Sequence, residues 1–308
     1  MLLQPLPIHL PSGNLIADRR YAWARDLEAK GDLAAAADLL TQVLELAPTY
    51  ASAWFALGEV REKLSDRGGA VVAFEKARVA DPQDRHGAAL HLIRLGAAPT
   101  RAMPEGYVRA LFNGYAPAFD QALTQGLGYR APELLLRAVQ VACPGERMKF
   151  GSVLDLGCGT GLAGAAYRPF CDWLVGVDLS SAMLAQARTK GLYDRLVEGE
   201  VLGFLNEEAG AKAHYHLVLA ADVFMYLDDL GPVLKAITPV LSGVVAFSVE
   251  TYEGDGIILR DTLRYAHSAA HVRAALAAAE LDLVSLDSAA TRTEKGIAVP
   301  GLIVMARC

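Results

Sequence analysis

The sequence predicts an α/β fold, a parallel sheet with helices on both faces, preceded by an all-α domain of helical repeats. From residue 150 onward, short apolar runs alternate with helical segments. The earlier part is rich in alanine and repeats with a period of 34 residues. A glycine-rich turn follows the first apolar run after residue 150, as expected where a buried strand gives way to a helix. We therefore expect a repeat domain over 1–98, a helical connector over 99–149 and the α/β domain over 150–308.

Composition limits the class of protein. The chain has 308 residues, of which 53% are hydrophobic and 21% charged, enough for about two packed domains. A net charge of −6 gives no general basic field, which disfavours nucleic acid as a partner. No apolar stretch is long enough to cross a bilayer and the start lacks the pattern of a signal peptide, so we expect a cytoplasmic protein with no membrane partner.

The cysteines predict neither a disulfide framework nor a metal site. Cys143, Cys158, Cys171 and Cys308 are scattered, without a C-x-x-C pair or a histidine-containing cluster. We interpret them as small apolar fillers or free thiols. Cys158 lies inside the glycine turn, where a small side chain beside a ligand explains it better than a redox role.

The first domain is explained by a repeated helix pair. Pro48 and Pro82 are 34 positions apart, and large, small and helix-stopping residues recur in register between the two copies. The second copy contains Trp54, Leu57, Gly58, Ala70, Phe74, Ala77 and Pro82, and the first, weaker copy contains Gly31, Ala36, Leu40 and Pro48. Over residues 17–95 this pattern resembles the tetratricopeptide (TPR) family. An unrelated bundle of helical hairpins is the alternative.

Two such repeats are marginal for stability, so a third, shorter helix over 91–95 should cap them. The connector then carries aromatic residues at helical spacing, among them Tyr107, Phe112, Tyr115 and Phe119. We expect residues 107–120 to form a movable lid over a site in the α/β domain. Plain packing is the alternative, since aromatic residues at this spacing pack into a core in most proteins.

In the α/β domain we expect seven strands. They are placed near 152–156, 173–177, 194–199, 215–220, 243–249, 281–287 and 300–306, with only the turn 293–296 between the last two. Helices should begin after Gly161, at Ser180-Ser181, near Glu200, after Asp228-Asp229 and at Ser268, with the serines and aspartates as caps.

The turn after the first strand predicts a nucleotide site. It contains Gly157, Gly159 and Gly161, which allow the backbone to pass close to a ligand just before a helix begins. Asp178 ends the next apolar run, 23 positions after Asp155. A carboxylate at the tip of the neighbouring strand can accept hydrogen bonds from both ribose hydroxyls.

Charge favours one nucleotide over another. Gly159, Gly161 and Gly164 also satisfy the dinucleotide pattern G-x-G-x-x-G, but Asp155 would face the pyrophosphate as a like charge. S-adenosylmethionine (SAM) has no phosphate and carries a cationic ammonium group. Residues 153–161 with Asp178 resemble the class I SAM-dependent methyltransferases. The resemblance implies a seven-stranded Rossmann-like fold, SAM as cofactor and S-adenosylhomocysteine (SAH) as product, with Asp155 orienting the amino-acid end of SAM.

The same resemblance suggests further cofactor contacts. Leu179 and Met183 follow Asp178 and should enclose the adenine ring, with simple core filling as the alternative for Met183. After the third strand, Glu200 and Val201 occupy the motif that binds the adenine amino group. The family usually has aspartate at the position of Glu200, Glu198 is a rival, and a helix-start glutamate is the alternative.

Candidates for the acceptor side lie at the later strand ends. Asp222 and Tyr226 follow the fourth strand, beside the methyl group in this fold, and we include Asp222 among the cofactor contacts. Tyr115 of the connector should face the methionine end of the cofactor or the acceptor. His267 is a candidate general base, with a structural role beside a helix start as the alternative. Arg264 could hold a carboxylate substrate, and Glu250 also lies at a strand end.

As a whole, the chain resembles a bacterial group of predicted methyltransferases that carry TPR repeats. Our first interpretation is methyl transfer to oxygen, nitrogen or sulfur of a small molecule. A protein methyltransferase that docks its substrate on the repeats is the alternative enzyme, and a non-catalytic adaptor is the alternative from another class. The repeats would serve a protein partner or self-association.

Overall fold

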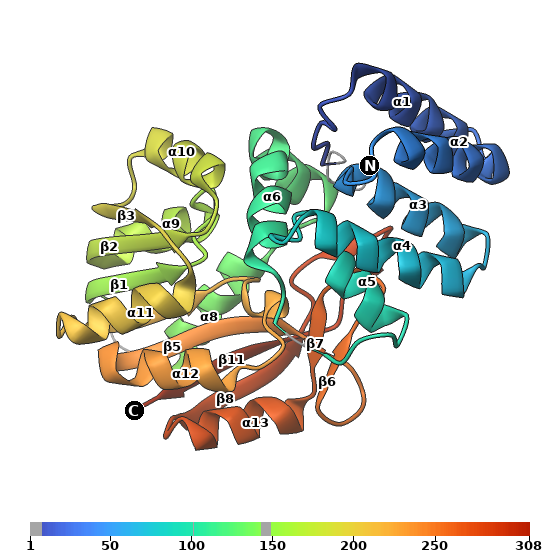
Figure 1. Cartoon of the computed structure of the whole chain (residues 1–308). Coiled ribbons are helices and arrows are strands. Elements are labelled where there is room, and N and C mark those ends of the chain that lie inside the picture. The colour runs from blue at the N-terminus through green and yellow to red at the C-terminus, as the bar shows by residue number, and fades with distance from the viewer. Residues whose placement is uncertain (1–7, 101, 143–148) are drawn as a thin grey trace. The chain divides into compact units, whose positions relative to one another are not determined.

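The computed structural model describes residues 8–100, 102–142 and 149–308 and divides into two compact units (Figure 1). One unit ends at Leu111 and the other runs from Phe112 to Cys308. The connector expected over 99–149 is therefore shared between the units, with the division inside one helix. Cys143 lies outside the described residues.

The first unit consists of helices that pack as consecutive pairs, α1 with α2 and α3 with α4. The helices are α1 (Leu15–Ala29), α2 (Leu33–Leu46), α3 (Ala51–Lys63), α4 (Arg67–Ala80) and α5 (Ala88–Arg94), and α6 (Glu105–Tyr115) begins in this unit. The short α5 corresponds to the third helix that the sequence predicts over 91–95, and it begins three residues earlier.

The 34-residue period appears in the capping groups. Asp32 caps α2 by accepting from the N–H of Ala35 at 3.1 Å, and Asp66 caps α4 by accepting from the N–H of Gly69 at 2.9 Å. These two aspartates are 34 positions apart. Gly58 is small because a Cβ there would lie 2.7 Å from Cδ1 of Phe74. The repeat seen in the sequence thus corresponds to a repeated helix pair.

The second unit is built on a mixed sheet. Its main path has the order β3-β2-β1-β4-β5-β11-β8, in which β11 is antiparallel to both neighbours and the other pairs are parallel. The strands of this path are β1 (Phe150–Leu156), β2 (Cys171–Asp178), β3 (Arg195–Glu198), β4 (Tyr215–Ala220), β5 (Leu241–Glu250), β8 (Asp282–Ala289) and β11 (Gly301–Arg307). All seven expected strands are present.

The sheet has two further strands that the sequence analysis missed, so the count of seven is wrong for this sheet. β6 (Ile257–Leu259) and β7 (Tyr265–His267) form a short hairpin, and β7 pairs with the end of β5. Runs of three residues are too short to show the two-residue period of a strand.

The expected turn over 293–296 is also more elaborate. It belongs to a separate two-stranded hairpin of β9 (Thr293–Glu294) and β10 (Ile297–Ala298). Lys295 and Gly296 both have positive φ, +50° and +77°, as a tight hairpin turn requires. The connection between β8 and β11 is therefore a small hairpin.

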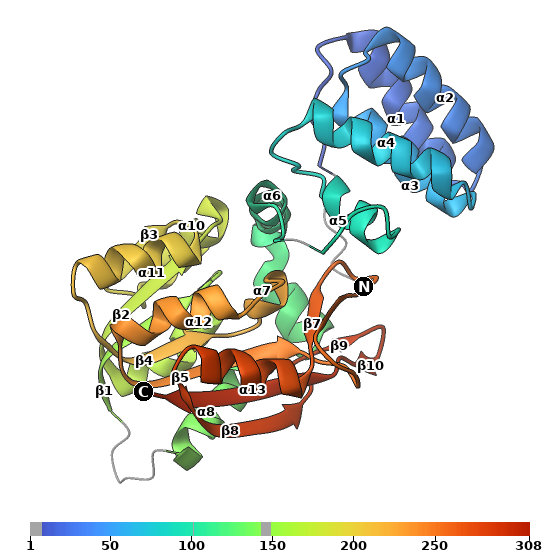
Figure 2. The ribbon, with the colours of Figure 1, turned by 60° about the horizontal axis from the view of Figure 1, so that its bottom comes forward.

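Helices cover both faces of the sheet, as expected. α11 (Val201–Gly210), α12 (Gly231–Ile237) and α13 (Ala269–Ala278) pack in a row on one face (Figure 2). α8 (Ala131–Ala142) and α9 (Leu162–Tyr167) pack on the other face, and α10 (Ser181–Lys190) contacts β2 and β3. Ser180, Glu200 and Ser268 are the N-caps of α10, α11 and α13.

Several short turns complete the second unit. They are η1 (Ala116–Ala118), α7 (Phe119–Gln121), η2 (Ala122–Gly126), η3 (Arg168–Phe170), η4 (Phe224–Tyr226) and η5 (Thr238–Val240). The first three follow α6, and η4 follows the carboxyl end of β4. In the described ranges, none of the helices is long and apolar enough to cross a membrane.

Candidate cofactor and acceptor site

The three glycines of the turn after β1 have different surroundings. Gly157, Gly159 and Gly161 all have positive φ, of 61°, 55° and 91°. A Cβ on Gly157 would lie 2.6 Å from Val223, and one on Gly161 would lie 3.0 Å from Tyr193. At Gly159 the nearest atom is Cε1 of Phe119, 3.9 Å away. Close ligand approach is therefore expected at Gly159, whereas protein side chains already explain the other two glycines.

Asp178 ties this turn to α10. One carboxylate oxygen accepts from the N–H of Gly159 and the other from the N–H of Ser180, both at 2.8 Å. The side chain belongs to a residue that is only 9% exposed, and burial raises the pKa of its carboxyl group. Each oxygen keeps a further lone pair, so hydrogen bonds to a ligand are not excluded by these contacts.

Asp155 is the second buried acid. It is 1% exposed and accepts a hydrogen bond of 2.7 Å from the hydroxyl of Tyr193. Burial raises the pKa of Asp155 to about 7, and the neighbouring Asp178 acts in the same direction. In the described part of the chain, no cation is among the groups that shift the pKa of either acid. The local field therefore suits a cationic ligand group.

The residues expected around adenine lie at the ends of β2 and β3. Leu179 is half-buried and Met183 is fully buried in α10. Glu200 caps α11 by accepting from the N–H groups of Leu202 at 2.9 Å and Gly203 at 2.7 Å, and Val201 begins that helix. The structure thus contains the contacts of the alternative interpretation, in which Glu200 caps the start of a helix.

Residues 112–120 contact the glycine turn and the start of α10. Asn113 accepts from the hydroxyl of Ser180 at 2.7 Å. Asp120 accepts from the hydroxyl of Thr160 and forms an ion pair of 2.7 Å with Lys190. Phe119 also lies beside Gly159, so residues 112–120 cover the glycine turn. This is the position that the lid interpretation requires of them.

The aromatic residues of the same segment meet η4. The rings of Phe112 and Tyr226 are edge to face with centroids 5.3 Å apart, and Phe112 also lies 6.1 Å from Phe119. Burial raises the pKa of Tyr115, and the nearby Tyr226 hydroxyl contributes. Tyr115 and Tyr226, both candidates from the sequence, are therefore neighbours.

Asp222 begins a polar cluster at the end of β4. Its φ of +55° is unusual for a residue other than glycine and marks local strain. Ser248 stabilises this conformation, since its hydroxyl accepts from the N–H of Asp222 at 2.8 Å and donates to its carboxylate at 2.7 Å. Thr291 donates to the other carboxylate oxygen at 3.0 Å, and Arg292 at 2.9 Å.

Arg292 connects this cluster to two more acids. It is 4% exposed and pairs with Glu250 and, at 3.1 Å, with Glu294, in addition to Asp222. Arg264 also pairs with Glu294, and Arg260 lies 3.4 Å from Glu250. Three arginines and three acids thus form one network. Arg264 and Glu250 were named from the sequence, whereas Arg292 and Glu294 were missed because nothing in their spacing connects them with β4.

The structure does not favour His267 as a general base. Its ring is fully buried on β7, 5.5 Å from that of His271, and burial lowers its pKa to about 4. Within the described ranges neither ring nitrogen makes a hydrogen bond of normal geometry, although the backbone carbonyls of Phe224 and Leu227 are nearby. The structural alternative, packing under η4 and beside α13, fits these observations.

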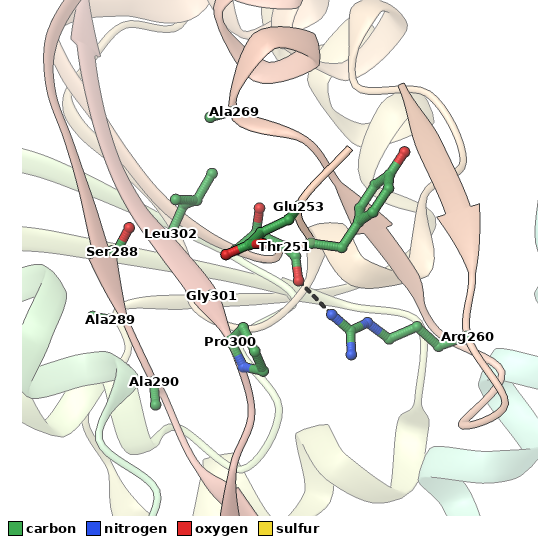
Figure 3. Close-up of a pocket in the computed structure, with 11 residues that line it drawn as sticks. Thr251, Glu253, Arg260, Ala269, Ser288, Ala289, Ala290, Pro300, Gly301 and Leu302 are labelled. Atoms are coloured by element: carbon green, nitrogen blue, oxygen red, sulfur yellow. Dashed lines mark hydrogen bonds between the residues drawn. The ribbon is translucent and has the colours of Figure 1, made fainter. Parts of the chain in front are cut away.

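A groove of about 660 Å³ opens beside the network (Figure 3). It is lined by residues 251–253 after β5, by the end of β8 and by the start of β11. Arg260 forms part of its wall and donates to the carbonyl of Thr251. The glycine turn and the two buried acids do not line this groove. In addition, no group of three or more metal-binding side chains is found among the residues that are described.

Comparison with known families agrees with this geometry. Residues 154–243 match the family described as methyltransferase domain. The matched stretch contains the glycine turn, both buried acids, Glu200 and Asp222. This match supports a SAM-dependent methyltransferase with SAM as its cofactor.

One curated relative and two solved structures illustrate the likeness. Human methyltransferase-like protein 27 is 43% identical over 86 residues, which are 28% of this chain and 34% of that protein. The chain thus aligns with about a third of the length of this relative. The Burkholderia thailandensis 1,6-didemethyltoxoflavin-N1-methyltransferase, solved with 1,6-didemethyltoxoflavin and SAH, has a TM-score of 0.51 and 19% identity, covering 68% of this chain and 92% of its own. A SAM-dependent methyltransferase from Clostridium acetobutylicum has a TM-score of 0.47 and 18% identity, covering 64% and 98%.

Proposed function

We propose that this chain binds SAM at the glycine turn and transfers its methyl group to oxygen, nitrogen or sulfur of a small molecule. The observation that carries the proposal is the pair of buried carboxylates, Asp155 and Asp178, beside a turn that is open at Gly159. A pyrophosphate would meet two acids there, without a cation among the groups that act on them. The ammonium and ribose of SAM suit the same groups.

In this proposal each residue of the site contacts a different part of the cofactor. Asp155 attracts the ammonium group and Gly159 lets the backbone approach the ligand. Asp178 accepts from the ribose hydroxyls while its two backbone hydrogen bonds hold it in place. Leu179 and Met183 enclose the adenine ring, and Glu200 and Val201 lie at its edge.

The acceptor side is formed by the connector and by the residues after β4. SAM, when bound, supplies a methyl group on a positively charged sulfur. The chain then has to align the acceptor atom with that methyl group, and to accept a proton only if the acceptor carries one. We assign the alignment to Tyr115, Tyr226 and Asp222, with the Arg292 network fixing Asp222. Tyr226 replaces His267 as our preferred proton-handling group.

A small acceptor is favoured by the cover over the site. The lid segment contacts η4 and the glycine turn through Phe112, Phe119 and Asp120. The aromatic side chains around the site suit an enclosed ligand. The helix pairs of the first unit, with their 34-residue period, support TPR repeats. We propose that they bind a protein partner or a second copy of the chain and take no part in methyl transfer.

The test is transfer of radiolabel from SAM to fractions of a small-molecule extract. Label should move to a small-molecule fraction with the intact chain and not with Asp178→Ala. Label found only on protein would favour the docking alternative. Binding of SAM without transfer to any fraction would favour the adaptor.

A further inference from the structure

Three glycines surround one tyrosine ring behind the glycine turn. Gly161 and Gly164 lie at and after the turn, and Gly176 lies on β2. A Cβ would come within 3.0 Å of Tyr193 Cε2 from Gly161 and within 2.8 Å of its Cε1 from Gly176, and one on Gly164 would overlap its hydroxyl. The distances from Gly164 and Gly176 are shorter than carbon contacts tolerate, and the distance from Gly161 is tight. Part of the G-x-G-x-x-G pattern therefore makes room for a protein side chain.

The position of Tyr193 is fixed by its neighbours in the chain. It follows Gly191, the left-handed C-cap of α10, and comes just before β3. From there the ring reaches under the turn, and its hydroxyl donates to Asp155 at 2.7 Å. Among the described residues, the Tyr193 hydroxyl is the one side-chain group that donates a hydrogen bond to the Asp155 carboxylate.

Among the described residues, no other side chain near Asp155 donates a hydrogen bond to it. The titratable groups that act on it or are acted on by it are Asp178, Cys158, Tyr129, Tyr167 and Tyr193. All of them are neutral or negative. A backbone N–H from Gly164 is the remaining group that favours the charged carboxylate. The tyrosine hydroxyl thus has a large share in keeping Asp155 ionised and oriented.

We propose that Tyr193 is a positioning residue of the cofactor site. Its ring supports the glycine turn from the protein side, and its hydroxyl holds the Asp155 carboxylate for the ammonium group of the cofactor. This inference rests on the proposed function. It predicts a specific defect when only the hydroxyl is removed, because the ring still fills the space left by the three glycines.

The direction of that defect follows from charge. Without the donor, the buried Asp155 favours its protonated form more strongly. At neutral pH a larger fraction of Asp155 is then protonated and uncharged. The ammonium group of a ligand binds the charged carboxylate, so the affinity of such a ligand at neutral pH falls. A ligand without the ammonium group should be unaffected.

The experiment compares Tyr193→Phe with Tyr167→Phe by calorimetry over a range of pH. Tyr167 is a matched control, because it is fully buried near Asp155 and its hydroxyl has no partner among the described residues. The probes are SAH, which has the ammonium group, and 5′-methylthioadenosine, which lacks the amino-acid end. Tyr193→Phe should weaken SAH about ten-fold at neutral pH and move the acid limb of its affinity to higher pH. Its 5′-methylthioadenosine affinity, and both affinities of Tyr167→Phe, should match the wild type.

Equal losses for both probes, or an unchanged pH profile for SAH, would overturn the proposal. If the wild type binds neither probe, the proposed function fails. The role of the hydroxyl is then tested without ligand, because Tyr193→Phe should still raise the pH at which Asp155 titrates in unfolding measurements, and no change would refute it. The ring is tested by Gly164→Ala, which should destabilise the wild type but cost less in a Tyr193→Ala background.

Discussion

At the scale of single residues, the site depends on carboxylates that are buried before any ligand arrives. Asp155 and Asp178 are almost inaccessible, and burial raises the pKa of both. Burying a carboxylate without a cation costs stability, and such groups concentrate where function requires them. The acids therefore lower the stability of the ligand-free chain and favour a cationic ligand.

This cost should be visible as a pH dependence of folding. The pKa of Asp155 is about 7 in the folded chain and near 3.8 in the unfolded chain. Between these values the folded state holds the extra proton, so its contribution to stability is present at low pH and is lost as pH rises toward 7. From about pH 5 to about pH 8, the wild type should lose roughly 2–3 kcal/mol more than Asp155→Asn in denaturant titrations. Parallel curves for the two proteins would contradict the burial argument.

Gly159 should be sensitive for a different reason. Its positive φ disfavours a β-branched residue, and it is the glycine of the turn that faces open space. Gly159→Val should abolish SAH binding while the chain stays folded. Gly191→Val is the matched control, because Gly191 has a similar φ of +61° with no atom within 4 Å of an added Cβ. Similar SAH affinity in both variants would mean that the turn is not the ligand site.

At the scale of elements, the segment from Phe112 to Asp120 is held to the glycine turn by a few polar contacts. Asp120 pairs with Lys190 at 2.7 Å and accepts from Thr160, and Asn113 accepts from Ser180 at 2.7 Å. Partly exposed contacts of this kind each contribute about 1 kcal/mol or less. We therefore expect this segment, the proposed lid, to open on the time scale of ligand exchange.

We expect Asp120→Ala to accelerate ligand exchange. The association and dissociation rates of SAH should both rise, by roughly three-fold, while the equilibrium affinity changes less. Surface plasmon resonance measures all three. Asp172→Ala is the control, since it removes an ion pair with Lys149 of the same 2.7 Å length from an exposed position on β2. Unchanged rates in Asp120→Ala would show that this contact does not limit access.

The sequence predicted the elements well where they are long and periodic. The seven long strands, the helix starts at Ser180, Glu200 and Ser268 and the 34-residue helix pairs all appear in the structure. Strands of two or three residues were missed, because β6, β7, β9 and β10 are too short to show a period. They are stabilised in local hairpins, β6 with β7 and β9 with β10, and β7 also pairs with the end of β5.

For the site, too, residues that lie close together in the sequence were predicted and residues brought together only by the fold were missed. Asp155, Asp178 and the glycines were recognised because they lie close together in the sequence. Arg292 was missed because its three acids come from positions 42 to 70 residues earlier and from the next hairpin. His267 was proposed from its pKa and its place before a helix, and neither of these shows that β7 buries its ring.

At the scale of the whole molecule, the chain contains two compact units that join inside α6. The glycine turn, both buried acids, the segment from Phe112 and the Arg292 network all belong to the second unit. The proposed cofactor site therefore draws all of these residues from the second unit. The first unit adds exposed helical surface, which includes Trp23 and Val79 at 62% and 78% exposure.

A fragment that begins at Thr100 should consequently bind SAH within a few-fold of the full chain. It keeps all of α6 and the whole second unit. The full chain should differ from it in self-association or in binding to a protein partner, measured by analytical ultracentrifugation and by co-purification. A fragment that is folded by circular dichroism yet does not bind SAH would contradict the separation of roles.

The central claim, a SAM site built on two buried carboxylates, is tested most directly by one calorimetric comparison. The wild type and Asp178→Ala are titrated with SAH and with NAD. The wild type should bind SAH and show no heat with NAD. Asp178→Ala should bind SAH more weakly by about 2–4 kcal/mol, because it loses the ribose contacts and the hydrogen bond from Gly159. Binding of NAD by the wild type, or an unchanged SAH affinity in Asp178→Ala, would contradict the account.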